Sequence, residues 1–493
     1  MGQQKYAGWR KPESTGLVPG LSAAASVLAV VSLMVAVGLW FFAGAPLLAV
    51  IVLVVSVLVI APTMVRIRGI SAGEMLTAWM RTLPIRAREA QLYKTGLFSH
   101  IPGGRSPLPG LASPITLTDC FDPDSGEDIG ALVNLVHHTI TVVLVVAVHG
   151  QDTLPQQIID GRVAGWGEFL RIMGEHGDVA GVAVVSETVP ETGATYTAEV
   201  ESRRSELAPD LAAEVVDARA EEMPLDTIRA TQRIAITFRY HSGAFIDGVA
   251  SVSRRLPELR TAAAGAGLQA DFCLSSEIVA FTHTAFNPAA AGRIDELMAR
   301  SGDTGLRWTD AGPSFHDDTN PRFYLHDSGR SMTYRAYEFP VQPVDEQILA
   351  KILGKNFRAP YKRVTMIYRP YRPADARQLA DGQLRDSFAG SQRTHRGLTD
   401  IRQQIRFEDN AATREDLAEG HGLTDVGILV TVTVPFEASG RDAAQMLDDA
   451  AVSSSFAFAP CLTDQAAMFL AGLGIGVYPD MDETKAGPGA WAA

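Results

Sequence analysis

The chain has 493 residues, 20% of them charged, and a formal net charge of −13. This length is enough for two to four domains of roughly 100–200 residues each. The charge is unevenly spread, because residues 1–100 hold nine Lys and Arg against three acidic residues, a net +6, which leaves −19 on residues 101–493. An acidic region lacks the clustered Lys and Arg that phosphate contacts need, so direct nucleic-acid binding is not expected.

Three cysteines, Cys120, Cys273 and Cys461, lie far apart and form no C-x-x-C pair. Their odd number and wide spacing support neither a disulfide framework nor a zinc site. We predict that they are three small buried apolar residues.

The first 65 residues contain two uncharged apolar runs. After a short tail at 1–16, the runs occupy 17–43 and 47–65, and Gly44 and Pro46 separate them. Each matches the roughly 20 apolar residues that cross a hydrocarbon core, so 17–65 are predicted to form a transmembrane hairpin. A cleavable signal peptide would be shorter, and two buried core helices would show a polar stripe. Basic residues flank the runs and the connecting loop is uncharged, which predicts a multi-pass protein of the inner (cytoplasmic) membrane with both termini cytoplasmic.

The region after the hairpin, 66–114, is predicted to be a juxtamembrane helix and a linker. Residues 71–90 form an amphipathic pattern that could lie on anionic lipid or pack on the rest of the chain as a linker helix. Pro and Gly are dense in 101–114, which marks the linker. Five residues are expected at the membrane interface, in contact with lipid: Trp40, Arg66, Arg68, Trp79 and Arg81.

Beyond residue 114, strand-like and helix-like segments alternate, which is typical of an α/β (α+β) fold. Both halves place a long charged helical stretch before a β run, which predicts two similar β-α-β modules at 115–300 and 331–493, joined by an irregular connector at 301–330. The expected strands are 138–148, 179–185, 233–240, 331–340, 361–371 and 425–435, with a short strand near 268–273. The alternation in 233–240 predicts a strand with one wet face. The expected helices are 155–176, 193–222, 244–264, 289–300, 374–419, 441–451 and 463–472, with a helical stretch beginning near 275.

Familiar catalytic motifs do not occur in the sequence. The only Gly-Lys pair, Gly354-Lys355, lacks the earlier glycine of a Walker A motif. Residues 265–270 (GAGLQA) match a dinucleotide fingerprint in letters, but they follow a predicted helix and precede a strand, so we predict a helix cap. We therefore expect a non-enzymatic protein with no catalytic residue, no cofactor and no metal.

Three further segments carry polar or basic side chains that could form a site, and each has a simpler structural interpretation. His137 and His138 are adjacent in a predicted strand, so they point to opposite faces and cannot easily share a metal. Residues 316–318 (HDD) are interpreted as a solvated loop. Residues 361–372 (YKRVTMIYRPYR) interleave aromatic and basic side chains as single-strand nucleic-acid platforms do. An exposed strand end is the simpler interpretation of that segment.

The N-terminal residues Tyr6, Trp9 and Pro12, together with 70–85 (ISAGEMLTAWMRTLPI), resemble the PrgI-like membrane proteins of conjugative systems, and most closely an actinobacterial conjugation-associated family. Residues 464–474 resemble the segment that ends the N-terminal domain of type IV secretion ATPases. The resemblance implies a front part of such an ATPase without its nucleotide-binding domain, and it implies a separate P-loop ATPase and other subunits of the same complex as partners.

The resemblance thus predicts a non-catalytic, membrane-anchored structural subunit of a conjugative or type IV-like secretion complex, which docks an ATPase at the cytoplasmic face. An EccE-like component of type VII secretion has a similar architecture and stays open as an alternative. A membrane-tethered enzyme, such as a transferase, is a third possibility.

Overall fold

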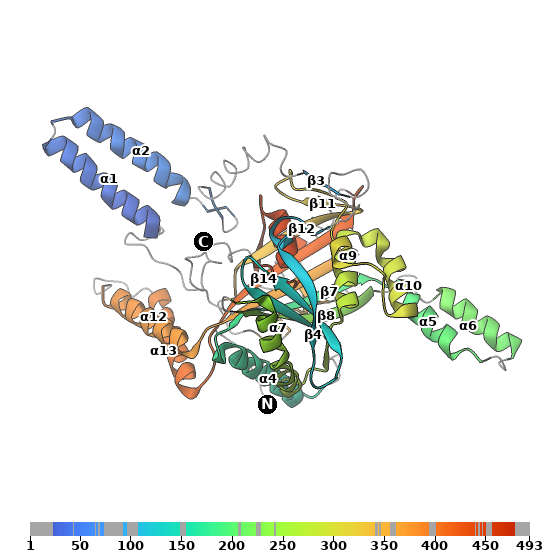
Figure 1. Cartoon of the computed structure of the whole chain (residues 1–493). Helices are drawn as coiled ribbons and strands as arrows, with labels where there is room; N and C mark the ends of the chain where they lie inside the picture. The colour runs from blue at the N-terminus through green and yellow to red at the C-terminus, as the bar shows by residue number, and fades with distance from the viewer. Residues whose placement is uncertain are drawn as a thin grey trace.

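The computed structural model describes residues 23–42, 44–64, 66–67, 70–72, 92–95, 107–147, 154–205, 209–222, 228–240, 243–340, 344, 347–354, 361–393, 401–438, 440–441, 444–445, 447–449 and 456–478. The N-terminal part begins with two helices that lie side by side (Figure 1). Its elements are α1 (Ala23–Phe41), α2 (Pro46–Met64), β1 (Arg66–Ile67), β2 (Ile70–Ser71) and β3 (Leu92–Lys94).

The next part of the chain alternates strands and helices. It begins with η2 (Gly110–Ala112), β4 (Ile115–Phe121), β5 (Asp128–Asn134), β6 (Thr139–Val146), α4 (Gln156–Glu175) and β7 (Val179–Pro190). It continues with α5 (Ala194–Arg203), α6 (Asp210–Glu222), β8 (Ile228–Arg239), α7 (Phe245–Ser253) and α8 (Leu256–Gly265). It ends with β9 (Ala270–Phe272), α9 (Ser275–Phe286), η3 (Pro288–Ala290) and α10 (Ala291–Ser301).

The last part uses a similar sequence of elements. These are η4 (Trp308–Asp310), β10 (Phe315–Asp317), β11 (Tyr324–His326), β12 (Gly329–Glu338), α11 (Ala350–Leu353) and β13 (Tyr361–Pro370). They are followed by α12 (Pro373–Arg393), α13 (Ile401–Glu419), β14 (Thr424–Pro435), β15 (Ala457–Pro460) and α15 (Gln465–Ala471).

One large antiparallel sheet contains the strands from β3 onward. Its order is β3-β10-β11-β12-β14-β13-β7-β8-β6-β5-β4, with β15 also paired to β12 and β9 to β6. Since β8 pairs antiparallel with both β6 and β7, those two strands run parallel to each other on either side of it. Strand β14 lies in the same way between β12 and β13. The expected mixed α/β class is confirmed, with a sheet that is antiparallel throughout its described pairings.

The sheet has two well-packed faces, because successive strand residues point to opposite sides. Val142 and Leu144 of β6 join a core under α4, α7 and α8, whereas Val143 joins the opposite core, which contains α9, α15 and residues 472–478. A third core fills the space around α11 on the first of these faces. Most of β8 is therefore buried on both faces, and the wet face expected for 233–240 does not exist, because helices cover both sides.

Several expected boundaries change in the structure. Residues 193–222 form two helices, α5 and α6, and 374–419 form α12 and α13, so each expected long helix is a helical hairpin. The connector at 301–330 contains β10 and β11. Glycine caps end α8 as expected, with Gly267 at φ +73° in the left-handed region that favours glycine.

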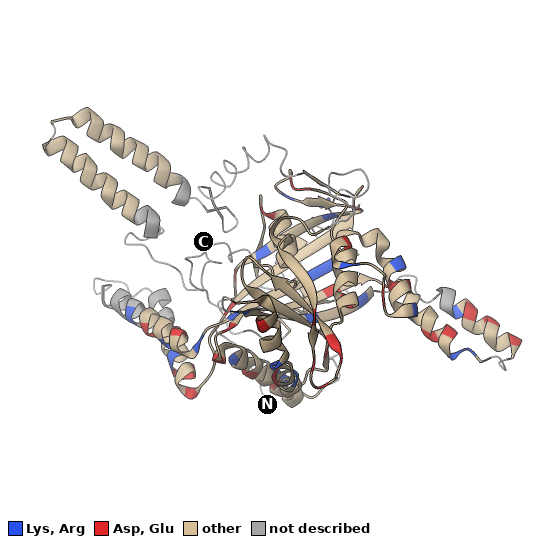
Figure 2. Ribbon diagram, in the orientation of Figure 1, with Lys and Arg blue, Asp and Glu red and all other residues tan. Residues whose placement is uncertain are grey.

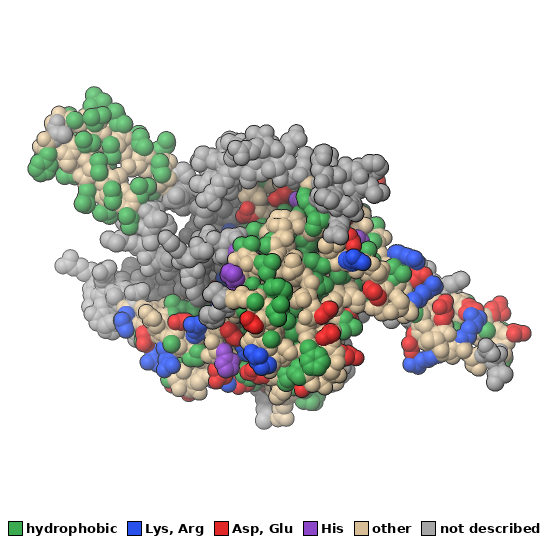
Figure 3. All heavy atoms as spheres, in the orientation of Figure 1, with side chains coloured by type: hydrophobic (Ala, Val, Ile, Leu, Met, Phe, Trp, Pro, Cys, Tyr) green, Lys and Arg blue, Asp and Glu red, His purple; other side chains and the backbone are tan. Residues whose placement is uncertain are grey.

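The expected membrane localisation is contradicted. Within the described residues, no helix is both long enough and apolar enough to cross a membrane. The sequence prediction counted every uncharged residue from 17 to 43, whereas α1 and α2 hold 19 residues each, about 28 Å at 1.5 Å per residue. The two helices expose most of their large apolar side chains (Figure 3), among them Met34 at 66% and Leu58 at 74%. An apolar surface of this extent is unusual without a cover.

Candidate functional site

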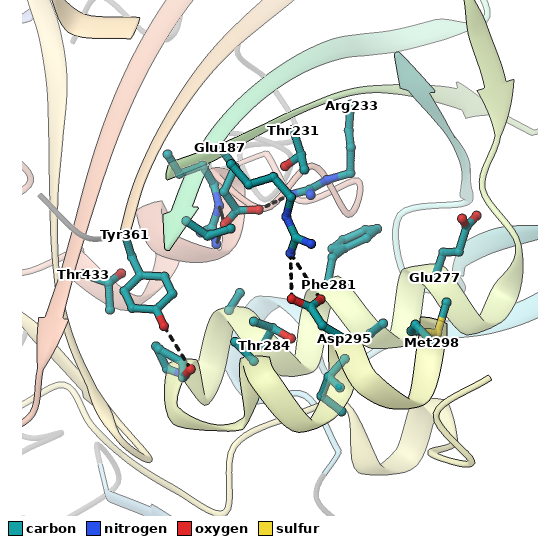
Figure 4. A pocket seen from close by; sticks show the side chains of 18 of the residues that line it. Glu187, Thr231, Arg233, Glu277, Phe281, Thr284, Asp295, Met298, Tyr361 and Thr433 are labelled. Carbon is teal, nitrogen blue, oxygen red and sulfur yellow. Dashed lines mark hydrogen bonds and ion pairs between the residues drawn. The ribbon is translucent and has the colours of Figure 1, made fainter. Parts of the chain in front are cut away.

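A cavity of about 260 Å³ lies between the sheet and helices α9 and α10 (Figure 4). Strands β7, β8 and β13 supply its charged floor, and the helices supply a mainly apolar wall. Arg229, Thr231 and Arg233 alternate along β8, so all three side chains share the face that looks toward the cavity. The same alternation places Glu187 and Val189 of β7, and Tyr361 and Arg363 of β13, on that face.

The floor is centred on Glu187, which is held between two arginines. Arg363 Nη2 donates to Glu187 Oε1 at 2.6 Å, and Arg363 Nε donates to the same oxygen at 3.1 Å. Arg233 Nη2 donates to Glu187 Oε2 at 2.8 Å. Both carboxylate oxygens are thus occupied, one by each arginine.

Strand register explains this arrangement. Glu187 pairs directly with Arg363 across β7 and β13, which places their side chains on the same face at close range. Arg233 pairs with Val185, two residues before Glu187 on β7, so it reaches Glu187 diagonally. The three charges come from positions 187, 233 and 363 of the sequence, and only the sheet brings them together.

Burial makes the electrostatics of this cluster strong. The Arg233 and Arg363 side chains are 7% and 5% exposed. Burial alone would raise the pKa of Glu187, but the charges of Arg363 and Arg233 and their hydrogen bonds outweigh it and lower that pKa to about 2. Glu187 is therefore ionised at neutral pH, and the cluster carries two positive charges against one negative charge.

A second ion pair closes the cavity on the helix side. Arg229 Nη2 donates to both carboxylate oxygens of Asp295 on α10, at 2.9 and 3.1 Å. Thr192 Oγ1 donates to Asp295 at 2.7 Å, so this carboxylate is well supplied with donors. On the strand side, the Tyr361 hydroxyl donates to the carbonyl of Pro288 at 3.2 Å. These contacts tie η3 and α10 to the sheet and fix the shape of the cavity.

Three guanidinium nitrogens at this cavity have no hydrogen-bond partner among the described residues: Arg229 Nε, Arg233 Nε and Arg363 Nη1. Aromatic rings offer partial compensation, since the Phe281 ring centre lies 4.2 Å from Arg233 Cζ and the Phe469 ring centre lies 5.5 Å from Arg363 Cζ. A buried N–H without an acceptor is costly, so these donors mark the cavity as a place where an acceptor group can bind.

The residues expected at a membrane interface lie elsewhere. Trp40 is near the end of α1 and is 51% exposed, and Arg66 lies in β1. Arg68, Trp79 and Arg81 fall outside the described residues, as does most of the expected amphipathic helix 71–90. Neither Trp40 nor Arg66 lines the cavity.

The polar clusters considered in the sequence also lie apart from it. His137 and His138 belong to the turn between β5 and β6 rather than to a strand. His316 and Asp317 belong to β10 and are half-buried, so the solvated loop expected at 316–318 is wrong. Within the described part of the chain, no group of three or more His, Cys, Asp or Glu could hold a metal ion. Cys120, Cys273 and Cys461 are buried free thiols, as predicted.

The cavity is not apparent from the sequence, although one of its segments, 361–372, has a conspicuous pattern of aromatic and basic residues. Residues 361–372 are not an exposed strand end: β13 is central in the sheet, and Lys362 and Arg363 are buried. The sequence signal for the cavity is a charged residue at an inward position of a strand, as with Arg233 and Arg363.

No protein-family model matches the chain, and comparison with curated proteins finds no match either.

Proposed function

We propose that the chain is a non-catalytic docking subunit of a conjugative or type IV-like secretion complex, with a separate P-loop ATPase as its partner. The class of partner comes from the resemblance of residues 464–474 to the N-terminal domain of type IV secretion ATPases. The support for docking comes from two helical arms that extend from the sheet.

We define arm A as α5 with α6 and arm B as α12 with α13. Arm A connects β7 to β8, and arm B connects β13 to β14. These are matching positions, because β7 and β13 are the two central strands and β8 and β14 are their outer neighbours. The arms point away from the sheet in opposite directions (Figure 1), so a partner or pair of partners can be held at two points.

We infer that the arms belong to two similar modules. Toward the centre of the sheet, the strand order is β4-β5-β6-β8-β7 in one half and β10-β11-β12-β14-β13 in the other, so the two halves match. Short strands β9 and β15 then pair with the corresponding strands β6 and β12. This correspondence supports the two β-α-β modules that the sequence predicts, here joined edge to edge by the pairing of β7 with β13.

The observation that carries the docking proposal is an uncovered apolar stripe on α6. Leu211, Val215 and Val216 are 72%, 54% and 43% exposed. Leu211 and Val215 are four residues apart, which places them on one side of the helix, and Val216 lies about 100° further round. Arm A is fixed at its base, where α5 packs on α10, and Arg204 forms an ion pair of 2.8 Å with Asp217 of α6. A fixed helix with a free apolar stripe fits the mode in which a helix binds a groove of its partner.

Charge gives this surface a preferred partner. Residues 194–222 contain eight acidic and three basic residues, a net charge of −5, and acidic side chains gather along α6 (Figure 2). A complementary partner has a basic rim around an apolar groove. Opposite charge at the rim mainly speeds association and selects the partner, whereas the apolar stripe supplies affinity.

The test is affinity purification of the tagged full-length chain from cells that contain its neighbouring genes, followed by identification of bound proteins. Capture of a P-loop ATPase by the native chain and its loss from the Leu211→Ser/Val215→Ser variant would support the proposal. Val136→Ser is a matched control, because Val136 is 65% exposed in the turn between β5 and β6, far from arm A in the chain.

Two results would count against the proposal. One is that the native chain captures no P-loop ATPase. The other is that the double variant captures it as well as the native chain does. Capture of type VII secretion components by the native chain would instead favour the EccE-like alternative.

A further inference from the structure

The ion pairs at the floor of the cavity between the sheet and helices α9 and α10 are unequal in charge. Arg233 and Arg363 together carry two positive charges, and Glu187 carries one negative charge between them. Arg229 does not change this count, because Asp295 neutralises it at 2.9 Å. Within these ion pairs, one buried positive charge therefore exceeds the negative charges, an arrangement that is costly unless an anion or water approaches it.

The free donors specify the kind of group that can approach. Arg229 Nε, Arg233 Nε and Arg363 Nη1 lack partners among the described residues, and guanidinium groups only donate. Arginine keeps its proton at every physiological pH, so the donors cannot be removed by titration. The matching ligand group is an oxygen acceptor with negative charge, for which a carboxylate is well shaped.

The number of charges limits the ligand to a monoanion. Glu187 and Asp295 both line the cavity, and a dianion such as phosphate would be repelled by both. Glu277 also lines it and accepts a hydrogen bond from the Leu274 backbone at the start of α9. Lys362 also lines the cavity, but its ammonium donates elsewhere, to the carbonyls of Leu353 and Gly354 at 3.4 and 3.1 Å.

The rest of the wall selects the body of the ligand. Helices α9 and α10 contribute Phe281, Ile294 and Met298, and β7 contributes Val189 (Figure 4). These side chains are apolar, so they favour contact with an apolar part of the ligand. A cavity of about 260 Å³ is slightly smaller than ligand sites of roughly 300–1,000 Å³, which limits the ligand to a small molecule on the order of ten non-hydrogen atoms.

We propose that this cavity binds a small monocarboxylate with an apolar body, its carboxylate at Arg233 and Arg363 and its body against α9 and α10. The site joins residues of both halves of the sheet, because Arg363 comes from β13 and Arg233 from β8. This proposal is independent of the docking arms, since no residue of α6 lines the cavity.

The experiment is isothermal titration calorimetry of the purified full-length chain with sodium hexanoate. Saturable binding with a dissociation constant of about 1 mM or tighter is expected. Hexanamide has the same shape without the charge and should bind at least tenfold more weakly. Inorganic phosphate tests whether any anion suffices, and it should give no saturable heat in the same range.

Three variants locate the binding. Arg363→Lys keeps a positive charge beside Glu187 but loses the planar donor set, so hexanoate affinity should fall at least tenfold. Ala280→Leu narrows the cavity without altering an arginine and should also weaken binding, which keeps the test informative if Arg363→Lys does not fold. Arg171→Lys, in an exposed ion pair on α4, should leave affinity unchanged.

Four results would overturn the proposal. The first is that hexanoate gives no saturable heat, which would mean that water alone satisfies the free donors. Hexanamide could bind within threefold of hexanoate, or phosphate could bind more tightly. The fourth is unchanged hexanoate affinity in both Arg363→Lys and Ala280→Leu.

Discussion

Glu187 and Arg363 face each other directly across the pairing of β7 with β13, and their side chains meet at 2.6 Å between Oε1 and Nη2. This is the line along which the two halves of the sheet join. The same carboxylate also accepts a hydrogen bond from Arg233, so one acidic side chain on β7 links an arginine of β8 to an arginine of β13. Loss of this carboxylate would leave two buried arginines without their shared ion-pair partner.

The first prediction is that Glu187→Gln destabilises the chain by about 3 kcal/mol, because removing one partner of a buried ion pair leaves uncompensated charge. Urea unfolding followed by circular dichroism measures the change. Glu168→Gln is the matched control: Glu168 pairs with Arg171 at 2.7 Å, but its side chain is 55% exposed, so the cost should stay below about 1 kcal/mol. Equal effects of the two substitutions would contradict the importance of burial here.

The second prediction concerns the close packing of residues 472–478 on the sheet. Gly476 has φ +79°, and a Cβ placed there would lie 2.2 Å from Thr141 Oγ1. That hydroxyl is hydrogen-bonded to Thr237 Oγ1 at 2.8 Å in the core. Gly476→Ala should therefore lower the free energy of unfolding by about 2–4 kcal/mol through strain and overpacking.

The control for this glycine is Gly167→Ala in α4, where a Cβ would meet nothing within 4 Å. A helix-interior glycine costs about 0.5–1 kcal/mol relative to alanine, so this variant should be slightly more stable than the native chain. Thermal unfolding of both variants separates the two cases. A stable Gly476→Ala variant would show that residues 472–478 can move off β6 and β8.

Local sequence patterns predicted many elements of this fold, since each depends on its own residues. The run 138–148 became β6, 361–371 became β13, and 155–176 became α4 with nearly the same ends. Two failures have one cause. The helices at 193–222 and 374–419 are interrupted, and β10 and β11 appear in a polar region, because pairing with distant strands and packing decide those boundaries.

The cavity could not be predicted because its chemistry depends on register. Glu187, Arg233 and Arg363 are far apart in the sequence, and a shift of one residue in any strand would send a side chain to the other face. The sequence did show basic residues within apolar β runs. In 233–240 the alternation predicts a wet strand face, which is the usual meaning when a sheet is covered on one side. Helices on both sides of this sheet change that meaning.

The third prediction concerns the exposed apolar surface of α1 and α2. Side chains such as Met34 and Leu58 are largely exposed, so the surface should drive self-association in aqueous buffer. A chain that lacks residues 1–65 should sediment as a smaller, more uniform species than the full-length chain. Analytical ultracentrifugation at two concentrations measures this. If the truncated chain self-associates as strongly, the responsible surface lies elsewhere.

The fourth prediction is that the free energy of unfolding depends on pH through two opposing contributions, one from two histidines and one from Asp318. Burial lowers the pKa of His326 and of His316 to about 4, so the unfolded chain binds protons more readily and stability falls as pH drops from 6.5 to 4. Burial, with Asp464 and Asp317 nearby, raises the pKa of Asp318 to about 7. The folded chain then binds the proton more readily, so this residue adds stability as pH drops from 7 to about 4.

Asp318→Asn separates these terms, because it removes the opposing group and leaves both histidines in place. At pH 8 the variant should be more stable than the native chain by about 2 kcal/mol, since a buried carboxylate no longer has to ionise. Between pH 6.5 and 4 its stability should fall more steeply than that of the native chain, because the histidines act alone. Urea unfolding at pH 4.5, 6 and 8 measures both slopes. Parallel slopes for the two chains would mean that Asp318 is hydrated and titrates as an ordinary carboxyl group.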